Sequence, residues 1–202
     1  ILLMTPYYFQ KLLIMNNLHC IGNISYWHAI IQSESNYIHI NHTFQKQSYL
    51  SQFEIMTSNG KLKLSIPTQK STRKGMYSEV LIDYSNNWQT ELWRSIQNAY
   101  SKSPFFLYYG YKLEEVILKR HLKLVDLNWE LFKVLGSCIH KPLDIELEKE
   151  EITRYQETRI GNLANYPQVF DDRLDFESNL GIIDVLFNLG PETIDYLLGI
   201  RV

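Results

Sequence analysis

A short polar run, Gln45-Lys46-Gln47, is the first place in the chain where the residue types suggest ligand chemistry. A lysine ammonium is a compact cation that suits a phosphate or a carboxylate. The two amides can donate and accept neutral hydrogen bonds, as sugar hydroxyls require. We therefore treat the three side chains as candidate substrate-binding residues, and an exposed loop lysine without a ligand as the alternative.

A second cationic stretch covers residues 68–75, TQKSTRKG, and carries Lys70, Arg73 and Lys74. Polar residues with a glycine at the end predict a loop. Three cations on one loop could meet a phosphate, and the alternative is a solvated loop with no ligand.

Asp184 and Asn188 lie four residues apart in an otherwise apolar run, so they share one face of the helix that this run predicts. A buried charge is costly unless it is paired. Either the two side chains line a cleft, with Arg94 in the same substrate site, or Asp184 is paired inside the protein and Asn188 closes the helix end. Arg94 is the candidate partner on the second interpretation.

The chain has six histidines, and none forms an HxH or HExxH pattern, so neither a metal site nor a cofactor is predicted. His19 is the histidine of interest, because His19-Cys20-Ile21-Gly22 resembles the start of the HxGH signature of nucleotidylyltransferases. Histidines at a helix N-terminus there stabilise a transferring phosphate. The second histidine is absent, since Asn23 follows Gly22. GxGxxG, P-loop and nucleophile-elbow motifs are also absent.

The clearest element that could position such residues is a helix predicted over residues 88–100. Its apolar positions share one face: Trp88, Leu92, Trp93, Ile96, Ala99 and Tyr100. Asn86 or Asn87 could cap its first turn, and Ser103-Pro104 ends it and would open a second helix over 104–120. The aromatic face could be a stacking platform for a sugar or a base, or it could pack in the core.

The N-terminal half predicts a compact βαβ unit. Residues 12–15 and 37–40 are expected to be strands, and residues 24–32 a helix that Asn23 caps. Such a unit favours a parallel pair, with ligands at the carboxyl ends of the strands. These ends correspond to residues 16–22 and 41–47.

Further along, Asn59-Gly60 between two alternating runs predicts a hairpin of residues 52–56 and 62–66. The remaining predicted elements are strands at 78–84 and 143–147, helices at 125–137, 181–189 and 192–198, and a loop over 153–165. We expect an α/β fold: a small mixed sheet with an N-terminal βαβ unit and a hairpin, packed against a helical C-terminal half.

Length and composition fit one globular domain. The 202 residues have a net charge of −2, which does not indicate a nucleic-acid binder. No apolar run reaches the roughly 18 residues that a membrane span needs. Cys20 and Cys138 have no zinc-ligand spacing and predict free thiols in the cytoplasm. Residues 1–11 could be an N-terminal extension.

Three segments together resemble the WbqC-like protein family, whose members occur among genes for bacterial surface polysaccharide and O-antigen synthesis. They are residues 37–49 (YIHINHTFQKQSY), 87–106 and 166–196. The last contains NLGIIDVLFNLGPE, which is similar to a family-typical ending. The resemblance implies a single WbqC-like domain over residues 1–202. It also implies a glycan-linked role: a cytoplasmic protein that binds or modifies an activated sugar or sugar nucleotide, with group transfer as a candidate reaction.

The chain also departs from the family pattern. Leu50, Ser51 and Gln52 stand where members tend to carry an RNR-like basic pattern, and Leu92 stands where many carry a histidine. Two alternatives therefore remain open. The protein could be a non-catalytic scaffold or protein partner of a glycan-biosynthesis enzyme, or a divergent nucleotidylyltransferase-like enzyme that uses His19.

Overall fold

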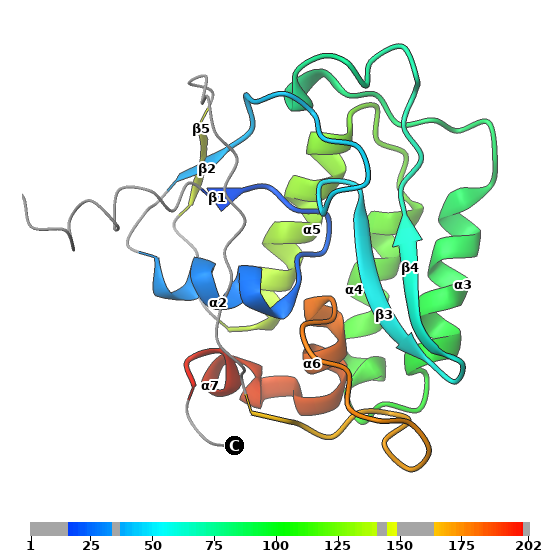
Figure 1. The fold of residues 1–202 in the computed structure, drawn as a ribbon, viewed down its shortest axis with the longest axis vertical. Helices are drawn as coiled ribbons and strands as arrows, with labels where there is room; N and C mark the ends of the chain where they lie inside the picture. The colour runs from blue at the N-terminus through cyan, green and yellow to red at the C-terminus, as the bar shows by residue number, and fades with distance from the viewer. Residues whose placement is uncertain (1–15, 34–36, 141–144, 149–163, 200–202) are drawn as a thin grey trace, which may run out of the picture.

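The computed structural model describes residues 16–33, 37–140, 145–148 and 164–199. Its first sheet has three short parallel strands in the order β1-β2-β5 (Figure 1). The strands are β1 (Asn16–Asn17), β2 (Tyr37–His39) and β5 (Glu146–Glu148). Helix α2 (Ile24–Gln32) connects the first two, so the predicted βαβ unit is confirmed. The strand predicted at 12–15 lies outside the described residues, as does most of the loop predicted at 153–165.

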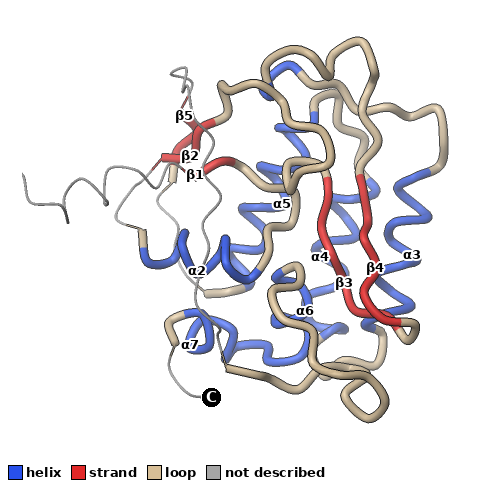
Figure 2. The backbone as a smooth tube through the Cα atoms, viewed as in Figure 1, coloured by secondary structure: helices blue, strands red, loops and turns tan. Residues whose placement is uncertain are grey.

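The hairpin forms a second, separate sheet (Figure 2). Strands β3 (Gln52–Thr57) and β4 (Gly60–Ser65) pair in antiparallel register, with Thr57 opposite Gly60. Gly60 has a φ of 96°, and the Thr57 hydroxyl donates a hydrogen bond to its carbonyl at 2.7 Å. Strand β3 is buried at Phe53, Ile55 and Met56, whereas β4 is mostly exposed. Parallel and antiparallel pairs are thus both present, and the α/β class is confirmed.

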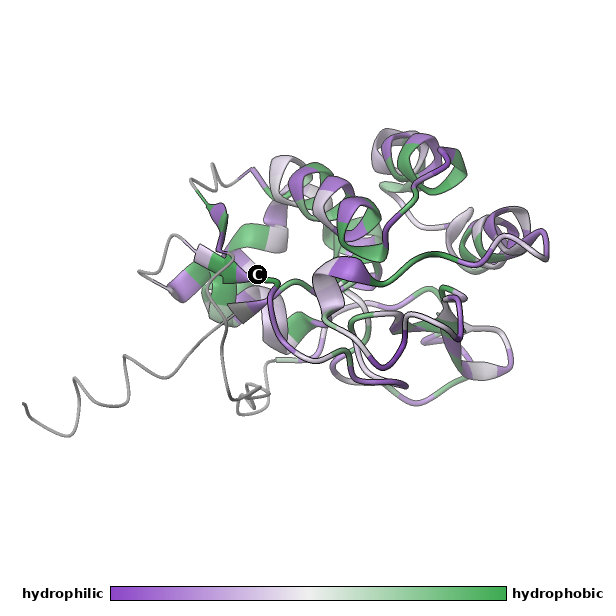
Figure 3. Cartoon of the chain, turned by 90° about the horizontal axis from the view of Figure 1, so that it is seen from above, coloured by the Kyte–Doolittle hydropathy of each residue, from purple (hydrophilic) through white to green (hydrophobic). Residues whose placement is uncertain are grey.

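Helices cover the hairpin and complete the core. They are α3 (Trp88–Tyr100), α4 (Phe106–Leu118), α5 (Leu124–Cys138), α6 (Ile182–Leu189) and α7 (Thr193–Leu197), with 3-10 turns η1 (Tyr77–Glu79) and η2 (Gly190–Glu192). Hydrophobic and hydrophilic residues lie on different sides of these helices (Figure 3), as an amphipathic pattern requires. Helices α3 and α6 both contact β3, and α4 packs against α3, α5 and α6. No described helix has the length and hydrophobicity of a membrane span.

Three local predictions were wrong. Residues 78–84 form no strand, because η1 takes Ser78 and Glu79, and the residues after it make only two isolated bridges, Leu81 to Lys123 and Ile82 to Thr68. Helix α4 begins at Phe106 rather than at Pro104, since a turn from Ser103 to Phe106 precedes it. At the start of α3, the Asn87 side chain accepts a hydrogen bond from the Thr90 hydroxyl and caps no backbone N–H.

The predicted cap of α2 is confirmed, and it occupies the N-terminus of that helix. The Asn23 side chain accepts from the Tyr26 amide at 2.9 Å. The Asn179 side chain accepts from the Ser25 amide, and the Leu180 carbonyl accepts from the Ile24 amide. The first free N–H groups of this helix are therefore satisfied by the chain itself.

Candidate functional site

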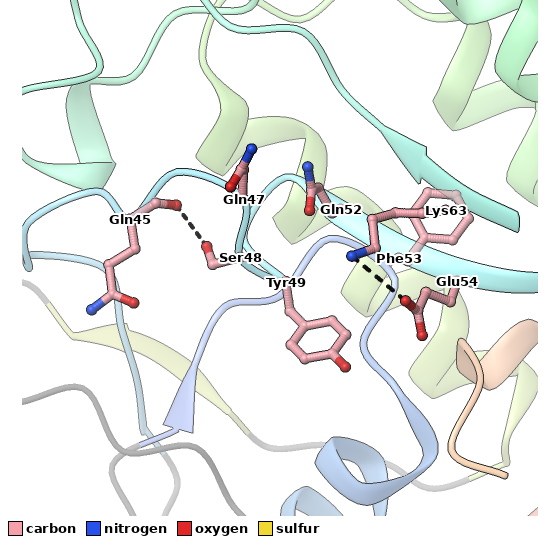
Figure 4. Close-up of a pocket in the computed structure, with 8 residues that line it drawn as sticks. All are labelled: Gln45, Gln47, Ser48, Tyr49, Gln52, Phe53, Glu54 and Lys63. Carbon is pink, nitrogen blue, oxygen red and sulfur yellow. Dashed lines mark hydrogen bonds and ion pairs between the residues drawn. The ribbon is translucent and has the colours of Figure 1, made fainter.

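The loop after β2 forms part of the wall of two neighbouring cavities. The smaller cavity has a volume of about 250 Å³. Its lining is mostly polar and comes from this loop and the hairpin: Gln45, Gln47, Ser48, Tyr49, Gln52, Phe53, Glu54 and Lys63 (Figure 4). Gln45 and Gln47, both predicted as substrate-binding residues, therefore line a cavity.

The larger cavity has a volume of about 500 Å³, and it is lined by Lys46 and by Arg73, one of the three cations of the 68–75 loop. Its lining combines these two cations with hydroxyls, amides and three apolar side chains: Phe44, Lys46, Gln47, Ser51, Gln52, Ser65, Ile66, Pro67, Thr68 and Arg73. Gln47 and Gln52 line both cavities, so the two hollows adjoin. Lys46 and the 68–75 loop, separate candidates in the sequence, meet at this site.

Hydrogen bonds hold the loop in place. The Ser48 hydroxyl donates to the Gln45 carbonyl at 2.7 Å (Figure 4). The Cys20 amide donates to the Tyr49 carbonyl, and the buried Asn128 amide donates to the Leu50 carbonyl at 2.7 Å. Gln47 adopts a φ of 57°, the left-handed region that side-chain-bearing residues avoid. Backbone strain of this kind concentrates at ligand sites.

Hydrogen bonds to Thr68 fix the position of the Arg73 side chain, whereas the Lys46 side chain is exposed. The Arg73 Nε donates to the Thr68 hydroxyl at 2.9 Å, and a second guanidinium nitrogen donates to the Thr68 carbonyl. This leaves part of the guanidinium fork for an anion. The lysine is exposed on the loop. Together they give the larger cavity two positive charges, the chemistry that a phosphate requires.

Glu54 brings a carboxylate to the smaller cavity. It lies opposite Lys63 in the hairpin register, and Lys63 Nζ is 3.7 Å from Glu54 Oε1 (Figure 4). Lys61 Nζ is 3.6 Å from the other carboxylate oxygen. Neither Glu54 nor Lys63 was predicted as a site residue. The hairpin pattern could have indicated them, because paired residues of opposite charge sit side by side on one face.

His19 lies behind the wall of the smaller cavity rather than in it. Its ring is buried and stacks on Tyr26 at 4.2 Å and on Tyr49 at 5.5 Å between ring centres. Burial, together with the nearby His42, lowers the pKa of His19 to about 3. A neutral buried imidazole beside a helix whose N-terminus is already capped has no position from which to stabilise a phosphate. The geometry thus gives the nucleotidylyltransferase alternative no support.

The other four candidates lie away from both cavities. Trp88 is buried in the core, Arg94 is exposed on α3, and Asn188 donates a hydrogen bond from its amide to the Asp184 carbonyl within α6. The structure therefore does not bring Trp88, Arg94, Asp184 and Asn188 together with Lys46. The aromatic face of α3 packs in the core, as the second interpretation of that helix expected.

Asp184 is fully buried, and its predicted pairing with Arg94 was wrong. The carboxylate instead accepts hydrogen bonds from the Tyr100 hydroxyl at 2.7 Å, the Tyr166 hydroxyl at 2.6 Å and the Gln168 amide at 3.1 Å. Burial raises the pKa of Asp184, although these three donors oppose the shift. The aspartate therefore joins α3, α6 and the segment before α6.

Metal chemistry has no visible basis in the part of the chain that the structure describes. No group of three His, Cys, Asp or Glu side chains there could hold a metal ion. Both cysteines are free and buried, and burial raises their pKa, so neither is a reactive thiolate.

Comparison with known proteins gives one family and one distant relative. The model of the WbqC-like protein family matches residues 21–163, which include the loop and the hairpin that line both cavities. Isoleucine–tRNA ligase of Wigglesworthia glossinidia brevipalpis is 31% identical over 118 residues, 55% of this chain. The chain spans only 11% of that ligase. No solved structure matches.

Proposed function

Because the chain belongs to the WbqC-like protein family, we propose that it binds an activated sugar, such as a sugar nucleotide, during synthesis of a bacterial surface polysaccharide. A group-transfer reaction on that sugar, in the cytoplasm, is the chemistry that this role implies. The observation that supports the proposal is the joint lining of the larger cavity by Lys46 and Arg73. Two cations beside a second, amide-lined cavity match the two halves of such a ligand.

The larger cavity suits the nucleotide half of the ligand. Its cations would balance the charge of a diphosphate, and hydrogen bonds between charged groups are the stronger kind. Phe44, Ile66 and Pro67 give the same cavity apolar surface for a nucleobase. The amides of Gln45, Gln47 and Gln52 are neutral, so they suit hydroxyl groups in the smaller cavity.

The proposal is tested by thermal unfolding of the purified protein with a panel of sugar nucleotides: UDP-glucose, GDP-mannose and dTDP-glucose. A ligand that binds only the native state raises the melting temperature by mass action. We expect at least one of them to do so, and Lys46→Ala to remove most of the shift. Lys102→Ala is the matched control, because Lys102 is also exposed and lines neither cavity.

Absence of a shift with every sugar nucleotide, at millimolar concentration, would contradict the proposal. A shift that survives Lys46→Ala and also Arg73→Lys would place the ligand elsewhere. Arg73→Lys is preferred to alanine because Arg73 also holds Thr68, and lysine keeps the positive charge but loses the planar fork.

A second candidate function, a scaffold for a glycan enzyme, is favoured by one surface. Helix α4 exposes four large apolar side chains: Leu107, Tyr108, Tyr111 and Leu118, at 82%, 67%, 60% and 44%. Contiguous exposed apolar residues are typical of protein contact sites. Crosslinking in cells would test this role, with Leu107→Asp as the comparison. A glycan enzyme crosslinked beside α4 in the wild type alone would support it, and identical patterns would exclude it.

A further inference from the structure

The Glu54 carboxylate lines the smaller cavity, and the proposed function assigns it no role. We propose that Glu54 recognises the sugar, by accepting hydrogen bonds from two neighbouring hydroxyl groups of a neutral hexose. This inference rests on the proposed function, because it assumes that the phosphates occupy the larger cavity. The smaller cavity would then select a neutral hexose, and Glu54 would be the residue responsible for this selection.

Each Glu54 oxygen has a lysine partner that a ligand hydroxyl could displace. The distances from these oxygens to the Lys61 and Lys63 ammonium groups are 3.6 and 3.7 Å, longer than the 2.7–2.9 Å of a charge-assisted hydrogen bond. The lysine side chains are 41% and 58% exposed, so these ion pairs are weak and easily rearranged. An ionised carboxylate has two oxygens and about four acceptor sites, enough for two hydroxyl donors.

The backbone holds Glu54 at this position. Strand β3 pairs Glu54 with Lys63 in the hairpin, and the Gly181 amide donates to the Glu54 carbonyl at 2.8 Å. The main chain is thus bound on one side by β4 and on the other by the residue that precedes α6. A side chain on a strand held at both edges needs little reorganisation to bind a ligand, which favours affinity.

Charge decides which half of the ligand enters which cavity. The lining of the larger cavity carries Lys46 and Arg73 and no carboxylate, so it attracts a phosphate, whereas Glu54 and Lys63 balance each other in the lining of the smaller cavity. Because the lining of the smaller cavity carries no net charge, it favours neither a phosphate nor a cationic amino sugar. A neutral hexose fits the rest of the lining, because Gln45, Gln47 and Gln52 offer amides and Tyr49 offers an aromatic ring.

The test compares each sugar nucleotide with its own nucleoside diphosphate: UDP-glucose with UDP, GDP-mannose with GDP and dTDP-glucose with dTDP. Dissociation constants are measured by calorimetry for the wild type and for Glu54→Gln, which keeps the size of the side chain but removes its charge. We expect the hexose conjugate to bind the wild type more tightly than the diphosphate alone. Glu54→Gln should remove this gain, roughly tenfold or more, and leave the affinity for the diphosphate unchanged.

Glu177→Gln is the matched control. The Glu177 carboxylate is also 3.6 Å from the Lys61 ammonium, but it lines neither cavity, so the gain should persist in this variant. A gain that also persists in Glu54→Gln overturns the assignment of Glu54 while the proposed function stands. Binding of neither diphosphates nor conjugates by the wild type overturns the proposed function, and the role of Glu54 falls with it.

Discussion

At the scale of single residues, Gln47 combines a strained backbone conformation with a side chain that is a candidate ligand-binding group. Its φ of 57° is strained for a residue with a Cβ, and it lines both cavities. We expect Gln47→Gly to leave the free energy of unfolding unchanged or to raise it by up to about 1 kcal/mol, because glycine adopts this conformation without strain. The same change should weaken sugar-nucleotide binding. Urea unfolding and calorimetry measure the two effects.

His140→Gly is the control for the backbone effect, since His140 has a φ of 59° and lines neither cavity. Its stability should respond as that of Gln47→Gly does, without any loss of ligand affinity. Equal affinity of Gln47→Gly and the wild type would show that the strain at Gln47 has no connection to binding.

His19 makes stability depend on pH in a predictable direction. Its folded pKa is about 3, below the ordinary value of 6.5, so the unfolded chain takes up the proton first. The stabilising contribution is complete above pH 6.5 and is lost as the pH falls towards 3. Within this window we expect a loss of about 1.4 kcal/mol per pH unit from this residue. The measurement is the free energy of unfolding at pH 7 and at pH 4.5.

His19→Phe is the reference for this comparison, because phenylalanine keeps a ring beside Tyr26 and Tyr49 and cannot titrate. Burial lowers the pKa of His42 as well, but that residue acts in both proteins and cancels in the difference. Between the two pH values the wild type should lose about 2.5 kcal/mol more than the variant. Parallel pH profiles would mean that His19 is not buried in solution.

Sequence reasoning at the residue scale succeeded for local chemistry and stopped at long-range contacts. Lys46 and the 68–75 loop were each identified from residue types, but their meeting depends on how two loops fold back on the hairpin. Asp184 shows the same limit. A buried charge predicts a partner, but the partners are two hydroxyls and an amide from other segments of the chain. No pattern in one sequence indicates such contacts.

At the scale of elements, the Asp184 network joins α3, α6 and the segment that contains Tyr166 and Gln168. We expect Asp184→Asn to lower the free energy of unfolding by about 2 kcal/mol. An amide has one acceptor oxygen where the carboxylate has two, so a buried tyrosine hydroxyl or the Gln168 amide loses its partner. Urea unfolding measures the loss.

The same variant separates a structural role from a binding role. Asp184 lines neither cavity, so the melting-temperature shift caused by a sugar nucleotide should be as large in Asp184→Asn as in the wild type. Asn188→Ala, on the same helix, should cost less than about 1.5 kcal/mol, the value of one ordinary hydrogen bond. Normal stability combined with lost binding would return Asp184 to the candidate site.

Elements with a strong local signal were predicted within a residue or two, and weaker ones were not. Helix α2 with its Asn23 cap and the Asn59-Gly60 hairpin carry their own start and stop signals. The segment 78–84 has strand-like alternation, but Leu81 and Ile82 bond to different loops on their two sides. Those loops form no continuous ladder, so tertiary contacts override the local preference there.

At the scale of the whole molecule, one core links the family-matched region to the C-terminal helices. Buried apolar residues from Leu18 to Leu197 form a single cluster, whereas the family match ends at residue 163. We therefore propose that the domain continues through α6 and α7. The core includes Phe53 of β3, a strand that also carries Glu54, so folding of the C-terminal half and geometry of the site are connected.

The net charge of −2 means that the molecule as a whole offers an anionic ligand no attraction. Attraction must then be local, with Lys46 and Arg73 in direct contact with the phosphates, so the affinity for a nucleoside diphosphate should fall several-fold as NaCl is raised from about 50 to 500 mM, which screens exposed charges. The ratio of affinities for UDP-glucose and UDP should stay constant, since neutral hydroxyl groups bring no charge to be screened. In Lys46→Ala the salt dependence should be smaller, because one of the two cations is gone. A ratio that falls with salt would show that the smaller cavity binds a charged group, and a wild-type affinity independent of salt would show that the phosphates do not contact these cations.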